Sequence, residues 1–155
     1  MRELRLEALA NHPEVFSADT VLTEAESVEA WAGRLARYAR EGQGVICIAI
    51  ADDQLIGMSG LFRENWPKTR HSGTIWGVYV KKDWRSFHLA EAMMKECIAW
   101  AKGQGLVMVK LGVILNNTPA IRCYARCGFT VYGIDPKVIH YNDVFYDELL
   151  MVKRI

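Results

Sequence analysis

Residues 117–129 read NTPAIRCYARCGF and decide the fold. The beginning is typical of a helix start, because Asn117 or Thr118 can cap a helix and Pro119 suits the first turn, where no N–H is needed. The end is typical of a helix stop, because Gly128 accepts the left-handed backbone that follows many helices. Helical spacing would place three residues on one face: Ala120, Tyr124 and Cys127. The segment therefore predicts a short amphipathic helix that leads into a strand.

Length and composition predict one ordinary globular domain over residues 1–155. Hydrophobic residues make up 51% of the chain and charged residues 24%, which is enough to build a core without disulfides or a metal. The formal net charge of +1 provides no strong field for nucleic acid or an anionic membrane, and we expect neither as a partner. No run of eighteen apolar residues and no signal-peptide core is present, so we expect a cytoplasmic protein.

The four cysteines, Cys47, Cys97, Cys123 and Cys127, all lie inside apolar patterns. Small disulfide-rich secreted domains carry more cysteines, at loop positions. Cys123 and Cys127 are four residues apart, but no second Cys or His pair stands at zinc-like spacing. We therefore expect buried or half-buried free thiols and no metal site.

Hydrophobic periodicity predicts a mixed α/β order, α-α-β-β-β-α-β-α-β-β. Helices are expected up to about residue 10, over 24–41 with Thr23 near its start, over 89–102, and in the segment quoted above. Strands are expected over 45–50, 55–62, 74–80, 106–115, 129–132 and 149–155. The first of these is continuously apolar, as in a strand that is covered on both faces. A polar, aromatic connection is expected between the last two.

The Asn117, Ala120, Tyr124 and Gly128-Phe129 pattern resembles the carboxy-terminal signature of the GNAT family of acyl-coenzyme A-dependent N-acetyltransferases. The resemblance covers nearly the whole chain and implies the GNAT acyl-CoA N-acyltransferase fold, a mixed central sheet flanked by helices. The family begins with a strand before its first helix, whereas this sequence opens directly into a helix. Either the sheet lacks that strand or the gene start lies further upstream. We expect the sheet edge to be covered by a local segment or by a second subunit in a homodimer.

The same resemblance implies a site for the pyrophosphate of acetyl-CoA at the start of the helix over 89–102. The family pattern Arg/Gln-x-x-Gly-x-Gly/Ala falls here on Arg85, Ser86, Phe87, His88, Leu89 and Ala90. His88 replaces the central glycine, and Ser86 replaces the glycine that commonly follows the arginine. A histidine keeps a helical N–H in place if its φ is negative, and its ring can reach a phosphate. The alternative is an ordinary turn that binds nothing.

The resemblance also implies that the strand segment Val78, Tyr79 and Val80 binds the cofactor, with main-chain groups of Val78 and Val80 pairing with the pantetheine amides. Asn117 is expected to hold the cofactor near its sulfur. From chemistry alone, Asn117 is equally well a plain helix cap, and residues 78–80 are equally well sheet core.

Tyr124 is the implied catalytic acid, because a phenol can donate a proton to the departing thiolate. The alternative is a tyrosine that packs in the core. A backbone N–H near Val78 is expected to meet the oxyanion. Several family members carry a glutamate that acts as the general base at the position of Trp76. Tryptophan cannot take up a proton, so the candidates for the base here are Glu64, His71, Tyr79 and waters.

The acceptor implied by the resemblance is a primary amine of a small molecule or a protein. Its contacts are expected from the early helices, from the loop Arg63–Ser72 with Trp66, and from the connection Asp135–Glu148. Acidic and aromatic groups in that connection suit a cationic amine: His140, Tyr141, Asp143, Phe145, Tyr146, Asp147 and Glu148. A solvated loop is the alternative interpretation of them. The alternative function, favoured by the glycine-free loop, is a catalytically impaired acyl-CoA-binding or regulatory protein of the same fold.

Overall fold

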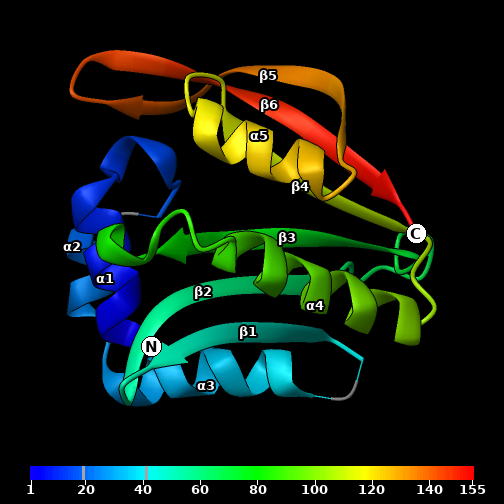
Figure 1. The fold of residues 1–155 in the computed structure, drawn as a ribbon, viewed down its shortest axis with the longest axis horizontal. Helices are drawn as coiled ribbons and strands as arrows, with labels where there is room; N and C mark the ends of the chain where they lie inside the picture. The colour runs from blue at the N-terminus through cyan, green and yellow to red at the C-terminus, as the bar shows by residue number, and fades with distance from the viewer. Residues whose placement is uncertain (19, 41) are drawn as a thin grey trace.

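A computed structural model describes residues 1–18, 20–40 and 42–155. Its centre is a six-stranded mixed sheet in the order β1-β2-β3-β4-β6-β5 (Figure 1). The strands are β1 Gly44–Ala51, β2 Gln54–Arg63, β3 Ser72–Val80, β4 Met108–Ile114, β5 Thr130–Tyr141 and β6 Val144–Arg154. The helices are α1 Arg2–Asn11, α2 Thr20–Ala25, α3 Val28–Ala39, α4 Leu89–Gly103 and α5 Thr118–Arg126, with 3₁₀ turns at Pro13–Val15 and Lys82–Trp84. The expected mixed α/β class is therefore confirmed.

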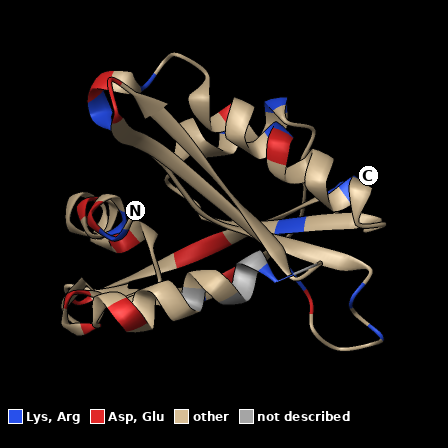
Figure 2. Ribbon diagram, turned by 90° about the horizontal axis from the view of Figure 1, so that it is seen from below, with Lys and Arg blue, Asp and Glu red and all other residues tan. Residues whose placement is uncertain are grey.

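Helices lie on both faces of the sheet. Figure 2 shows α3 on one side of the strands and α4 on the other. The main core lies between α4, α5 and the sheet, where Met94, Cys97, Leu111 and Tyr124 pack together. No described helix combines the length and the apolar character that a bilayer crossing needs.

The helix expected over 24–41 is wrong in its start. Two helices, α2 and α3, occupy this region, and Thr23 lies inside the first of them. Ser27 caps the second, because its hydroxyl accepts a hydrogen bond from the Ala30 N–H at 3.1 Å. The Ser27 cap starts a second helix. The apolar periodicity continues through this position, so the sequence pattern does not reveal the break. Glu41, at the end of the expected helix, lies outside the described residues.

β1 is an edge strand of the sheet, and α3 and α4 contact it from opposite faces, so the strand and its two-sided coverage agree with expectation. The coverage is incomplete, because Ile48 and Ile50 are 45% and 59% exposed. Within the described residues no strand precedes α1, and β1 pairs only with β2. A continuous apolar run identifies a strand but does not reveal its place in the sheet.

The expected connection between the last two strands is itself a hairpin. β5 and β6 continue to Tyr141 and Val144, and these two residues pair across the turn. Asn142 and Asp143 close it with φ of 48° and 60°, the left-handed values of a two-residue hairpin turn. Apart from glycine, Asn and Asp are the residues that tolerate these φ values best. The Asn142-Asp143 dipeptide was therefore a signal for a hairpin turn, but the polar composition of the segment suggested a loop.

β3 and β4 separate soon after they meet. They pair in parallel only where Ser72, Gly73 and Thr74 face Met108, Val109 and Lys110. On its other side, β3 bulges against β2: Gly77 and Val78 together face Ser59. Gly77 has a φ of 64°, which favours glycine. β4 meanwhile pairs with β6 along its whole length, so the sheet opens between residues 75–80 and 111–114.

Candidate functional site

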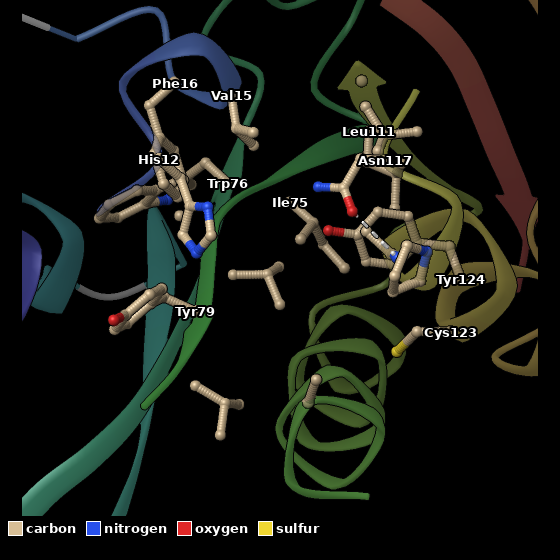
Figure 3. A pocket seen from close by; sticks show the side chains of 18 of the residues that line it. His12, Val15, Phe16, Ile75, Trp76, Tyr79, Leu111, Asn117, Cys123 and Tyr124 are labelled. Carbon is tan, nitrogen blue, oxygen red and sulfur yellow. Dashed lines mark hydrogen bonds between the residues drawn. The ribbon is translucent and has the colours of Figure 1, made fainter. Parts of the chain in front are cut away.

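A cavity of about 1190 Å³ lies where β3 and β4 separate. One wall is β3 with the segment that follows α1, and the other wall is β4 with α5 and part of the β5–β6 hairpin. The start of α4 closes one end. Figure 3 shows His12, Phe16 and Trp76 on the first wall and Leu111, Asn117 and Tyr124 on the second.

The backbone at the start of α4 follows a path that glycine normally takes. Ser86 has a φ of 74°, and His88, the residue before the helix, has a φ of 56°. The condition under which a histidine keeps a helical N–H in place, a negative φ, is therefore not met at His88. Five of the six loop residues line the cavity: Arg85, Ser86, His88, Leu89 and Ala90. Phe87 does not; it is 66% exposed and packs against Trp84.

Cationic side chains surround this helix start. Glu91, in the first turn of α4, lies 2.9 Å from His88 Nδ1 and accepts a hydrogen bond from Arg126 Nε at 2.7 Å. The hydrogen bond to His88 and then that to Arg126 lower the pKa of Glu91, so its charge is compensated. Arg122 also lines the cavity. Together with the free N–H groups of the helix start, this setting suits a phosphate group.

Arg85 ties the loop to the amino-terminal segment. Its Nε donates to the Val80 carbonyl at 3.1 Å, and its Nη2 lies 2.9 Å from His12 Nε2. Beyond Thr74, β3 has no pairing with β4, so the backbone groups on that side of Val78 and Val80 face the cavity. An extended ligand chain can pair with such an edge as an added strand does.

Tyr124 and Asn117 come from neighbouring turns of α5 and its cap. The Asn117 side chain accepts a hydrogen bond from the Ala120 N–H at 3.3 Å, so it is a helix cap that also lines the cavity. The Tyr124 side chain is only 8% exposed, and its hydroxyl points toward the gap between the strands (Figure 3). Burial, and then the neighbouring Cys123 and Cys127, raise its pKa, so the phenol holds its proton at neutral pH. A phenol that holds its proton can donate it.

Of the side chains expected as a base, Tyr79 lines the cavity but its hydroxyl is engaged on the far side of β3, and Glu64 and His71 lie outside the cavity. The Tyr79 hydroxyl donates to Glu7 at 2.9 Å and accepts from Asn11 at 3.3 Å, so its proton is directed into the packing of α1. Glu64 accepts from the Thr74 hydroxyl at 3.0 Å and does not line the cavity. His71 and the exposed Trp66 are also absent from the lining.

The expected acceptor segment contributes one carboxylate. Glu148 lines the cavity, whereas residues 140–147 do not and instead form the far end of the hairpin. Acceptor contacts were expected from the early helices, but the individual lining residues there were not identified, because they depend on where α1 meets β3: Arg5, His12, Val15 and Phe16. The Asn11-His12-Pro13 turn was the only local sign of this wall, since it marks the place where the chain leaves α1.

The arrangement fits an acyl-coenzyme A. The helix start and its arginines suit the diphosphate, and the unpaired side of β3 suits the pantetheine amides. The protonated Tyr124 stands beside the gap, where a thiolate would leave. Among the described residues no cluster of three or more His, Cys, Asp or Glu side chains is arranged to hold a metal ion.

Known proteins of similar sequence lead to the same class of site. Residues 6–129 match the model of the Acetyltransferase (GNAT) family. L-amino acid N-acetyltransferase AaaT of Escherichia coli (strain K12) is 28% identical over 145 residues, which are 91% of this chain and 85% of that protein. A streptothricin acetyltransferase of Escherichia coli is 31% identical over 87 residues, which are 56% of this chain and 48% of that protein.

Solved structures share the fold. Ribosomal-protein-alanine N-acetyltransferase of Brucella melitensis is 19% identical with a TM-score of 0.85, over 99% of this chain and 91% of that one. The acetyltransferase YncA of Salmonella typhimurium, determined with acetyl-CoA, is 19% identical with a TM-score of 0.82, over 99% of this chain and 85% of that one. The family match covers most of the chain. The protein therefore belongs to the GNAT family of acetyltransferases and is an N-acetyltransferase that uses acetyl-CoA.

Proposed function

We propose that the acceptor is the primary amine of a small zwitterionic molecule, an α-amino acid. The observation that carries this proposal is the pair of opposite charges in one cavity. Arg5, on α1, and Glu148, on β6, both line it. A guanidinium suits the carboxylate of an amino acid, and a carboxylate suits its ammonium group.

Two further observations support this acceptor. The Arg5 guanidinium carbon lies 4.6 Å from the centre of the Phe16 ring, which orients the cation beside an apolar surface. The segment after α1 walls the cavity with Val15 and Phe16, which favours a small acceptor over a protein chain. In addition, a relative that aligns with most of this chain is named an L-amino acid N-acetyltransferase.

For acetyl-CoA we propose the following roles. The backbone of Arg85–Ala90 (Arg85, Ser86, Phe87, His88, Leu89 and Ala90) holds the diphosphate, and Val78, Tyr79 and Val80 hold the pantetheine through their main chain. Asn117 holds the region of the sulfur, and Tyr124 donates the proton that the leaving sulfur needs. Except for Phe87, which is assigned only as part of the loop, these assignments rest on the lining of the cavity and on the raised pKa of Tyr124.

We propose further that the protein is a cytoplasmic homodimer of one-domain subunits. The exposed Ile48 and Ile50 on the edge strand β1 support a second subunit there. The four free cysteines suit a reducing compartment. Analytical ultracentrifugation tests the dimer, and a monomer at tens of micromolar would contradict it.

The test of the acceptor is a panel of amines at fixed acetyl-CoA, followed by thiol release. L-Amino acids, their amides, polyamines and short peptides separate the possibilities. We expect the amino acids to react best, and the amides to lose at least tenfold in kcat/KM because they lack the carboxylate that Arg5 binds. Arg5→Gln should remove that preference. Faster reaction of peptides than of free amino acids would instead show a protein acceptor.

A further inference from the structure

Glu148 rests on a residue that has no side chain. Between β4 and β6, Gly112 pairs with Leu150 and Ile114 pairs with Glu148. A Cβ atom built on Gly112 would fall on the carboxylate group of Glu148. The carboxylate therefore lies directly against the bare backbone of β4, and any other residue at position 112 would displace it. Both residues line the cavity.

Glu148 and Tyr124 flank the gap from opposite faces of the sheet. Leu111 and Val113 are buried in the core that contains Tyr124. Side chains alternate along a strand, so Gly112 belongs to the other face, and the carboxylate that covers it lies there too. An amine that enters on the Glu148 face meets a carbonyl held in the gap, while the group that leaves departs toward Tyr124.

The surroundings of Glu148 favour a carboxylate that takes up a proton. It is half-buried, and among the described residues its carboxylate has no hydrogen-bond or ion-pair partner. Burial, and then the charge of Asp135 on the paired strand β5, raise its pKa. The other charged or titratable groups along the cavity are Arg5, His12, Glu14, Tyr79, Arg85, His88, Glu91, Arg122, Cys123, Tyr124 and Arg126.

We propose that Glu148 is the general base of the acetyl transfer, and that Gly112 is the space that admits its carboxylate. Glu148 accepts a proton from the ammonium group of the acceptor, and the amine nitrogen then bonds to the thioester carbonyl carbon. The carbon–sulfur bond breaks, and the sulfur takes the proton of the Tyr124 hydroxyl. The second proton of the nitrogen leaves to solvent, from which Tyr124 is reprotonated, and Glu148 later releases its own proton. The inference rests on the proposed function, because it requires an amine acceptor on this face.

The test is the pH dependence of turnover in Glu148→Gln, with an L-amino acid as acceptor and saturating acetyl-CoA. We expect kcat at pH 7 to fall by about 10²–10³-fold, in the range that general-base catalysis supplies. The loss should shrink as the pH rises toward the pKa of the acceptor amine, because the free amine then needs no base. A residue with a merely structural role would not be rescued by alkali.

Three further variants complete the test. Glu64→Gln removes a half-buried carboxylate outside the cavity and should leave the pH profile unchanged. Asp135→Asn removes the charge opposite Glu148 and should shift the acidic limb of the profile to lower pH. Gly112→Ala keeps the carboxylate but displaces it, and should lower kcat while the thermal shift caused by acetyl-CoA stays as in the wild type.

The outcomes separate the two proposals. If Glu148→Gln keeps the wild-type kcat, or if its kcat falls by the same factor at every pH, the role of Glu148 is overturned and the proposed function is not affected. A wild-type protein that transfers acetyl to no amine in the panel would overturn both.

Discussion

His88 Nδ1 lies 2.9 Å from the Glu91 carboxylate, one turn into α4, while the backbone of His88 holds a left-handed φ of 56°. The side chain is thus drawn toward Glu91 and the backbone keeps a conformation that is costly for a residue with a Cβ. His88→Gly should relieve that cost, admit phosphate more closely and lower the Kd for acetyl-CoA several-fold.

Calorimetric titration measures this effect, and His88→Ala is its matched control. Alanine removes the imidazole but keeps the Cβ, so its backbone cost remains. Weaker binding in both variants would mean that the imidazole itself contacts the diphosphate.

Tyr124→Phe should abolish most turnover and leave cofactor binding intact. The proton that the buried phenol holds is lost with the hydroxyl, and general-acid catalysis contributes about 10²–10⁴-fold. Stopped assays of thiol release measure kcat, and the thermal shift with acetyl-CoA reports binding. Tyr141→Phe, at the far end of the hairpin, is the control, and equal losses in the two variants would remove Tyr124 from the mechanism.

Gly77→Ala should destabilise the protein by about 1–2 kcal/mol, because an alanine is strained at a φ of 64°. The space there is open enough, since the nearest atom to an added Cβ is Arg5 Nη1 at 3.6 Å. Urea unfolding measures the change. Gly103→Ala, where nothing lies within 4 Å, should cost nothing. An unchanged midpoint for Gly77→Ala would show that the bulge can relax.

Glu148→Gln should raise the melting temperature above that of the wild type at pH 8. Folding raises the pKa of Glu148 above its ordinary value of 4.5, so the ionised form is disfavoured in the folded state. The contribution of the wild-type residue to stability is fully present below that ordinary value and is lost as the pH rises through the raised pKa. The difference between the two proteins should therefore vanish in acid. Scanning calorimetry from pH 4 to 8 measures it, and a difference that is constant with pH would contradict the sign.

Much of the fold was predictable because local signals mark it. α5 follows from its Asn117 cap and its Gly128 stop, and α4 follows from an apolar face that ends at Gly103. Asn142-Asp143 and the Ser27 cap carried equally local information, but a polar composition and a continuing periodicity masked them. Here the signal was present and another pattern outweighed it.

The site was only partly predictable, for a different reason. Residues 85–90 and Tyr124 stand in motifs, and most of them line the cavity. The contact of Glu148 with Gly112 depends on the register between β4 and β6. The two residues are 36 positions apart in the sequence, so no local pattern indicates the contact. Arg5 and His12 likewise reach the cavity through the docking of α1, which is a tertiary event.

The brief pairing of β3 with β4 also has a mechanical consequence. The pairing of residues 72–74 and the neighbouring hydrogen bond from the Val107 N–H to the His71 carbonyl join the two halves of the sheet, so the halves can move apart beyond that seam without breaking the hydrogen bonds within either half. A ligand chain bound along β3 would hold the two halves together. Those amide hydrogens of residues 75–80 that face the gap, and not β2, would then exchange more slowly with solvent while acetyl-CoA is bound. A cell poor in acetyl-CoA would hold a more readily proteolysed enzyme.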